Sequence, residues 1–181
     1  MVCVVTDAPK GRELWLCAGQ KLLRLGGIGA VKLQALTDEL GLTTGSFYHH
    51  FSGMADYLDQ LARHYGSDQP REALALADDP DPRVRLRRLH ALSRDERAAP
   101  LDTAMRDWAG SNPLAATAVH DADEILLRFI ERAFVDLGYP GRAAQTRAAL
   151  LFSAGVARIS PPWRVGPNIL DEVLDVLAPR S

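Results

Sequence analysis

Cysteine is scarce in this sequence: only Cys3 and Cys17 occur, 14 residues apart. Two cysteines at that spacing make neither a disulfide framework nor a zinc-ligand pattern. No apolar run approaches the roughly 20 residues that span a bilayer. The apolar stretch near the N-terminus has no basic start before it and no cleavage pattern after it. We therefore expect no signal peptide, no membrane partner and a cytoplasmic location.

Catalytic motifs are also missing. The sequence contains no G-x-S-x-G, no H-E-x-x-H and no paired E-x-x-H of a di-iron bundle. The nearest group with metal-like spacing is His120 with Asp123 and Glu124, which we interpret as ordinary polar residues of a helix surface. We therefore predict a protein that is not an enzyme and has neither a cofactor nor a metal site.

An excess of positive charge is lacking as well. The chain has 21 lysines and arginines against 23 aspartates and glutamates, which gives a net charge of −2. Residues 1–66 contain six basic and six acidic residues, histidine not counted. This balance excludes a polybasic, histone-like protein, so any DNA binding must arise from local geometry on an ordinary surface.

What the sequence does have is helical periodicity. Hydrophobic residues make up 47% of the chain, and we find no convincing alternating run bounded by hairpin turns, so we predict an all-α fold. Helices are expected over about 10–25, 32–40, 44–50, 84–97, 101–110, 113–137, 141–159 and 168–177. A further helix is expected after Gly53, with Tyr57, Leu58 and Leu61 on its apolar side. The segment 66–83 is rich in Pro, Asp and Gly, and we interpret it as containing a junction. The arginines that follow are interpreted as a solvated face.

Residues 33–51 have the physical pattern of a helix-turn-helix. Gly41 supplies a permissive backbone for a tight turn, and Thr43 or Thr44 can cap the second helix. A small shared core is expected from Leu36, Leu40, Leu42, Phe47 and Phe51. The opposite face of the second helix carries small or polar residues, which suits entry into a major groove about 12 Å wide.

The amino-acid sequence of residues 40–51, L-G-L-T-T-G-S-F-Y-H-H-F, resembles the recognition segment of the TetR (tetracycline-repressor-like) family of bacterial transcription regulators. The resemblance is specific over about residues 12–61. It implies an N-terminal three-helix DNA-binding domain over 1–66, with the helix-turn-helix at about 32–51. It also implies a helical ligand-binding and dimerisation domain over 67–181.

The resemblance assigns roles by position. Base edges or adjacent phosphates would be met by Thr43, Thr44, Gly45, Ser46 and His49, and the DNA backbone by Lys32, Tyr48 and His50. Packing within the module is the alternative role of Tyr48 and His50. Two positions depart from the family: Lys32 stands near the usual Ser or Thr cap of the second helix, and Met54 stands where a lysine is common.

Two apolar stripes on residues 113–137, and small residues on the next helix, predict a homodimer with a four-helix interface. The interface residues expected are Leu126, Ile130, Phe134, Leu150, Leu151, Ala154 and Gly155; an entirely internal core is the alternative. The family resemblance also implies a cavity for a small, largely apolar effector. Its candidate lining residues are Leu89, Leu92, Met105, Trp108, His120, Phe129 and Trp163, each of which could instead be plain core.

The sequence therefore predicts a ligand-responsive transcriptional regulator. It would be a homodimeric repressor on a near-palindromic double-stranded DNA operator, released by a small effector. The alternative is a helical ligand-binding or interaction protein whose DNA-binding module is degenerate, because that module is formally neutral and has lost two expected phosphate contacts.

Overall fold

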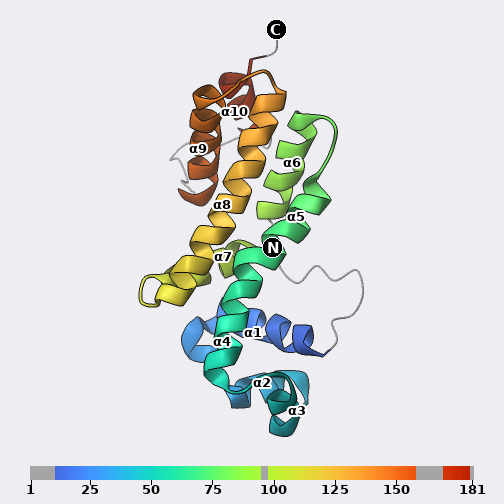
Figure 1. Cartoon of the computed structure of the whole chain (residues 1–181), viewed down its shortest axis with the longest axis vertical. Helices are drawn as coiled ribbons and strands as arrows, with labels where there is room; N and C mark the ends of the chain where they lie inside the picture. The colour runs from blue at the N-terminus through green and yellow to red at the C-terminus, as the bar shows by residue number, and fades with distance from the viewer. Residues whose placement is uncertain (1–10, 95–97, 158–168, 180–181) are drawn as a thin grey trace. The chain divides into compact units, whose positions relative to one another are not determined.

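A computed structural model describes residues 11–94, 98–157 and 169–179 of the chain. Those ranges contain helices and no strand, which confirms the all-α prediction (Figure 1). In chain order the elements are α1 (Arg12–Gly26), the 3-10 helix η1 (Ile28–Ala30), α2 (Leu33–Leu40), α3 (Thr44–His50), α4 (Met54–Arg63), the π-helical turn η2 (His64–Asp68), α5 (Gln69–Ala77), α6 (Pro82–Ser93), α7 (Ala98–Ala109), α8 (Pro113–Asp136), α9 (Arg142–Ala157) and α10 (Ile169–Leu177).

The helix ends follow local chemistry. Gly27 closes α1 with a φ of 66°, a backbone conformation that favours glycine. Asn112 begins α8, since its Oδ1 accepts hydrogen bonds from the backbone N–H of Leu114 at 3.0 Å and of Ala115 at 3.2 Å. Pro113 occupies the first helical position, where its missing N–H costs nothing. The predicted stop after α1 and the predicted start of α8 are both confirmed.

The segment between α4 and α6 is more helical than its composition suggests. The turn η2 passes directly into α5, and Pro70 lies in the first turn of α5, where proline is tolerated. By packing, the described residues form two compact units. The first unit comprises those within Met1–Glu72 and Arg94–Asp123, and the second unit those within Ala73–Ser93 and Glu124–Ser181. One boundary therefore falls inside the predicted junction segment.

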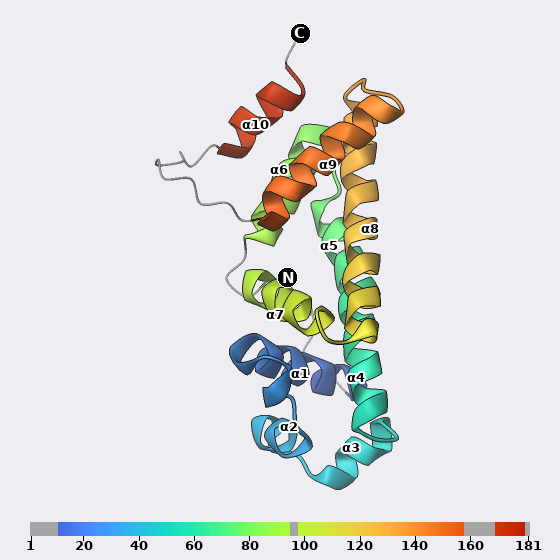
Figure 2. The same cartoon turned by 90° about the vertical axis from the view of Figure 1, so that its left-hand side faces the viewer.

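In the first unit, α1 lies between α7 and α2 (Figure 2). Its core combines apolar residues of α1 to α4 with Leu101, Met105 and Trp108 of α7. Close approach occurs at Gly66, whose position leaves no room for a side chain against the backbone of Ala118 in α8. Helices that follow the predicted DNA-binding segment by more than 30 residues thus contribute to the same core as that segment.

The core of the second unit is built around Leu86 of α6, Phe134 of α8 and Leu174 of α10. The arginines of α6 are not simply solvated, which corrects the sequence-based interpretation. Arg85 is buried and pairs with Asp136. Its neighbours also have acidic partners: Arg83 pairs with Asp175 at 3.1 Å, Arg87 with Asp171 at 2.7 Å and Arg88 with Asp79 at 2.9 Å. Two of these pairs join α6 to α10.

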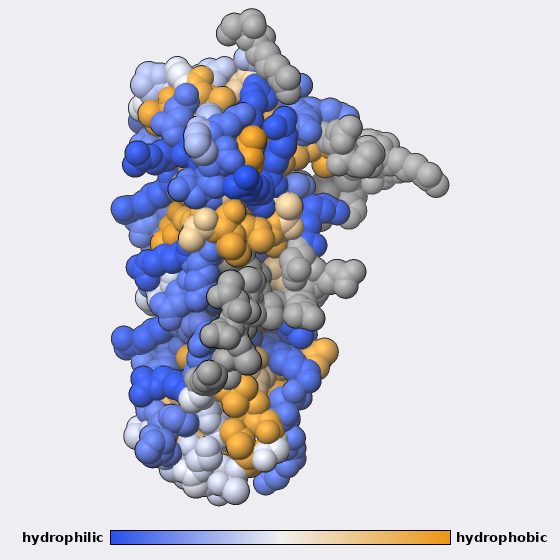
Figure 3. Space-filling view, turned by 90° about the vertical axis from the view of Figure 1, so that its right-hand side faces the viewer, coloured by the Kyte–Doolittle hydropathy of each residue, from blue (hydrophilic) through white to orange (hydrophobic). Residues whose placement is uncertain are grey.

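None of the helices in the described ranges is both long and apolar enough to cross a membrane. Within the same ranges, no three His, Cys, Asp or Glu side chains gather closely enough to hold a metal ion. The face drawn in Figure 3 is mainly hydrophilic, and its hydrophobic residues form separate patches.

Candidate nucleic-acid interface

Helices α2 and α3 are joined by a three-residue turn. Gly41 adopts the left-handed conformation, with φ 64° and ψ 28°, and its N–H bonds back to the carbonyl oxygen of Thr37. Thr43 then begins α3, because its Oγ1 accepts a hydrogen bond from the backbone N–H of Ser46 at 3.3 Å. Of the two caps considered from the sequence, the structure has Thr43.

Aromatic packing fixes the inner face of α3. Phe47 is fully buried, and its ring lies 5.4 Å from Trp15, 5.1 Å from Phe51 and 5.5 Å from Tyr57, measured between centroids. Leu36 of α2 is also fully buried in this core. These contacts leave α3 little freedom to rotate about its axis, so the direction of its outer face is set by the core.

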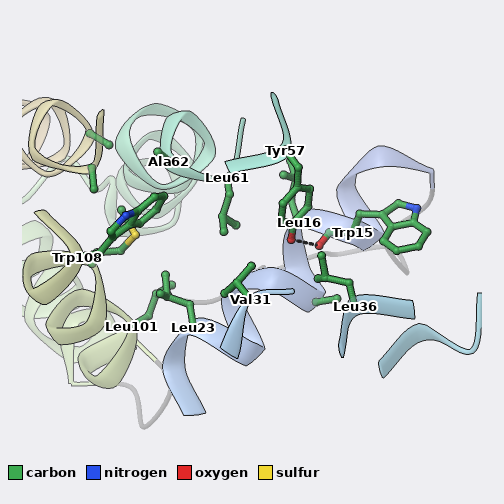
Figure 4. Close-up of a cluster of buried hydrophobic side chains, with 14 of the residues drawn as sticks. Trp15, Leu16, Leu23, Val31, Leu36, Tyr57, Leu61, Ala62, Leu101 and Trp108 are labelled. Atoms are coloured by element: carbon green, nitrogen blue, oxygen red, sulfur yellow. Dashed lines mark hydrogen bonds between the residues drawn. The ribbon is translucent and has the colours of Figure 1, made fainter. Parts of the chain in front are cut away.

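A hydrogen bond ties this core together. The Tyr57 hydroxyl donates to the backbone carbonyl oxygen of Trp15 at 2.8 Å, as the dashed line in Figure 4 shows. Burial raises the pKa of Tyr57, so the hydroxyl keeps its proton and remains a donor. The hydroxyl sits over Gly19 of α1, where the absence of a side chain makes room for it.

The prediction that Leu42 belongs to the core is wrong. Leu42 is 37% exposed, and Leu40 is only half-buried. Leu42 belongs to the turn and to neither helix, so the helical period that orders Leu36 and Phe47 does not apply to it.

The outer face of α3 is accessible. Thr43, Thr44, Gly45 and His49 are exposed, and the Tyr48 side chain is 58% exposed. Ser46 and His50 are half-buried, and Lys32, just before α2, is exposed. Seven of the eight residues predicted for DNA contact thus lie on α3 or at its cap, and Lys32 precedes the neighbouring helix α2.

Acidic residues near this face are engaged by protein donors. Lys21 pairs with Glu39 at 2.5 Å, and Arg63 pairs with Asp59 at 2.8 Å. Asp56, in the first turn of α4, accepts hydrogen bonds from Gln60 and from the backbone N–H of Ser52, which hold its pKa below the ordinary value.

The residues predicted for an effector cavity divide between the units. In the first unit, Met105 and Trp108 are buried together in the core, whereas His120 is exposed. In the second unit, Leu89, Leu92 and Phe129 are half-buried. Trp163 lies outside the described residues.

The residues predicted for partner contact differ sharply in exposure. Ile130 and Phe134 are buried in the core of the second unit, and Leu126 and Leu151 are half-buried. In contrast, Leu150 is 57% exposed, and Ala154 and Gly155 are also exposed. The exposed residues of this set thus all lie on α9.

Sequence reasoning missed a polar network in the first unit. The Tyr65 hydroxyl donates to Asp102 at 2.8 Å, and the Arg106 guanidinium bonds to both Asp102 and Asp123. The spacing of Asp102 and Arg106, four residues apart on α7, was a visible signal for one of these pairs, but the other partners are distant in the sequence.

Comparison with known proteins agrees with this geometry. Residues 16–61 match the model of the bacterial regulatory proteins of the tetR family. None of the curated proteins matches the chain.

Three solved structures share the fold over nearly the whole chain. A transcriptional regulator from Rhodococcus sp. Rha1 has 19% identity and a TM-score of 0.68, with 93% of this chain and 94% of that one covered. SCO7518 from Streptomyces coelicolor A3(2) has 21% identity and a TM-score of 0.66, with 94% and 99% covered. E. coli NemR in its reduced form has 16% identity and a TM-score of 0.63, with 93% and 95% covered. The matched segment spans the helix-turn-helix and its core, so residues 16–61 belong to the tetR family of bacterial regulatory proteins.

Proposed function

We propose that this protein is a homodimeric transcriptional repressor whose α3 enters the major groove of a near-palindromic operator. The observation that carries the proposal is the contrast between the two faces of α3: Phe47 is locked in an aromatic core, while Thr44, Tyr48 and His49 are exposed. A rigid helix with a small, polar outer face is what groove reading requires.

The proposed roles follow the sequence-based assignment. Thr43, Thr44, Gly45, Ser46 and His49 meet base edges or adjacent phosphates. Lys32, Tyr48 and His50 contact the DNA backbone. Phosphate contacts of this kind set register and affinity, whereas base-edge contacts set specificity.

The test is fluorescence anisotropy with labelled duplexes that cover the DNA flanking the protein's own gene. Alanine at Thr44, Tyr48 and His49 together should abolish specific binding without lowering stability, because all three side chains are exposed. The matched control places alanine at Arg71, Asp107 and Glu172, which are exposed on α5, α7 and α10. Unchanged binding by the first triple variant overturns the assignment of the reading face.

Dimerisation follows from the small contact area of a single α3. Two-fold pairing doubles the contacts and demands half-sites about one helical turn, or a multiple, apart. The exposed Leu150, Ala154 and Gly155 on α9 support a partner surface there. In analytical ultracentrifugation the wild type should sediment as a dimer, and Leu150→Glu should sediment as a monomer and bind DNA more weakly.

The effector is proposed to be small and largely apolar, and its binding would favour a dimer whose two α3 helices are wrongly spaced for the operator. A panel of uncharged apolar compounds added to the protein–DNA complex tests this, with loss of anisotropy as the expected result.

A second function has one observation in its favour: the formal neutrality of residues 1–66. A degenerate module in a helical ligand-binding protein would show no specific DNA binding even at low salt, where phosphate contacts are strongest. The same anisotropy experiment separates the two functions.

A further inference from the structure

Near α3, the side chains that could carry positive charge toward a DNA backbone are mainly histidines. Between Lys32 and Arg63 the sequence contains neither lysine nor arginine. Positive charge on α2, α3 and the first turns of α4 can therefore come only from His49 and His50. Phosphate contacts by cationic side chains supply a large part of the affinity for DNA, so the charge of these two imidazoles directly affects that affinity.

The two imidazoles lie at the open side of α3. His49 is exposed and His50 is half-buried, and their ring centroids are 5.0 Å apart. On its inner side His50 faces Phe51, with centroids 6.3 Å apart, and the guanidinium of Arg12 stands 5.9 Å from the same Phe51 ring. In the described part of the chain neither imidazole has an acidic hydrogen-bond partner, so both remain available to an external anion.

The charged groups of the helices packed around α3 do not replace them. On α2, Glu39 is paired with Lys21 of α1, and Asp38 accepts a hydrogen bond from Gln34 at 2.7 Å. Lys32, which precedes α2, is a fixed cation that has no acidic partner among the residues the structure describes.

The remaining neighbours lie on α4 and at the start of α1. On α4, Asp56 and Asp59 are negative, and Asp59 is paired with Arg63. On α1, Arg12 and Glu13 are adjacent and opposite in charge. The fixed charges around α3 therefore nearly cancel, and protonation of His49 and His50 is the change that makes this surface positive.

We propose that DNA binding by this protein is coupled to proton uptake, with His49 and His50 acting as phosphate contacts only in their protonated form. The inference rests on the proposed function. An imidazole changes charge between about pH 5 and 8, and a nearby phosphate favours the charged form. DNA binding then takes up protons, and affinity for DNA falls as the pH rises. Acidification strengthens repression, and alkalinisation releases it without any effector.

The size of the effect follows from linkage. Because a phosphate favours the charged form of an imidazole, each such contact makes binding several-fold tighter at pH 6 than at pH 8. In a dimer with several such contacts, the factors by which each contact changes the binding constant multiply. We therefore expect the dissociation constant of the wild type to rise at least several-fold between these two pH values at constant ionic strength.

The test uses the full-length protein and the same labelled duplexes from the DNA flanking its gene, titrated by anisotropy at about pH 6 and about pH 8. The variant His49→Gln/His50→Gln should bind at pH 6 as weakly as the wild type binds at pH 8, with a flat pH profile. His49→Lys should keep tight binding at pH 8, because lysine stays charged there. His90→Gln on α6, in the second unit, is the matched control and should keep the wild-type profile.

Each outcome is decisive. Binding by the wild type that is equally tight at both pH values overturns the proton coupling and leaves the proposed function standing. A wild-type pH dependence that persists in the double glutamine variant also overturns it. Absence of binding at pH 6 as well as at pH 8 overturns both this inference and the proposed function.

Discussion

The Tyr57 hydroxyl donates a 2.8 Å hydrogen bond to the backbone carbonyl oxygen of Trp15, and it does so directly over Gly19. A Cβ at Gly19 would lie 1.9 Å from the Tyr57 oxygen. No side chain fits at that distance, so α1 and α4 can hold their present contact only with glycine at this position. The aromatic core behind α3 therefore depends on a residue with no side chain.

We predict that Gly19→Ala lowers the free energy of unfolding by about 3 kcal/mol, because the core must shift to accept the methyl group. Urea unfolding followed by circular dichroism measures this. Gly29→Ala is the control, since a Cβ there meets no atom within 4 Å. In a Tyr57→Phe background the same alanine should cost less, because the clashing oxygen is gone. Equal costs in the two backgrounds would contradict this explanation.

A second close approach predicts a similar effect at Gly66. A Cβ there would lie 2.9 Å from both the Cα and the carbonyl oxygen of Ala118. Both are backbone atoms of α8 and cannot rotate away. Gly66→Ala should therefore cost about 2 kcal/mol of stability in the same urea experiment, although alanine ordinarily favours a helix. A stability equal to or above that of the wild type would show that α8 yields easily.

Local signals in the sequence were sufficient for much of the fold. Gly41 and Asn112 mark helix ends through backbone conformation and side-chain capping, which depend only on near neighbours. Gly66 and Pro70 mislead for the same reason: both resemble helix breakers. Pro70 is harmless in the first turn of α5, and the place of Gly66 is decided by Ala118, 52 residues away, which no local pattern reveals.

In the candidate site too, features set by near neighbours could be predicted and features set by distant contacts could not. The exposed face of α3 could be predicted because it repeats within one short helix and its turn. The partners of the α6 arginines could not, since Arg83 meets Asp175 and Arg85 meets Asp136, far along the chain. Stripes of apolar residues on α8 could not distinguish an internal core from a dimer surface either. Ile130 and Phe134 turn out to be internal to the second unit.

The cap of α8 allows a conservative test. Asn112→Ala removes the acceptor for the N–H groups of Leu114 and Ala115 and should cost about 1 kcal/mol of stability. Asn112→Asp keeps the acceptor and places a negative charge at a helix N-terminus, so it should retain the wild-type stability. The urea midpoints of the two variants test this prediction. Lower stability of both variants would mean that the asparagine amide group is needed.

Asp56 predicts a pH-dependent contribution to stability. Hydrogen bonds, first from Gln60 and then from Ser52, lower its pKa in the folded state. A group whose pKa is lowered by folding stabilises the folded state above its unfolded pKa of about 3.9, and this contribution is lost as the pH falls through the folded pKa. Asp56→Asn should therefore be less stable than the wild type at neutral pH, and the difference should shrink toward about pH 3. Glu172→Gln, on α10, is the control; a difference for Asp56→Asn that is the same at both pH values would contradict the assignment.

The network around Arg106 predicts coupling between α7 and α8 inside the first unit. Its guanidinium bonds to Asp123 at 2.7 and 3.0 Å and to Asp102 at 3.1 Å, and these carboxylates raise the pKa of Arg106. Arg106→Met leaves two partly buried carboxylates without their cation and should cost about 2 kcal/mol of stability.

Arg106→Lys tests whether charge alone suffices, because one ammonium cannot reproduce the forked contact with both carboxylates. We expect its stability to lie between those of the wild type and Arg106→Met. Combining Arg106→Met with Asp123→Leu removes a carboxylate that the methionine leaves unpaired, so the double variant should be less destabilised than the sum of the two single changes. Strict additivity in the urea experiment would mean that Arg106 and Asp123 contribute independently, and the guanidinium would then be a packing residue of α7 and not the link to α8.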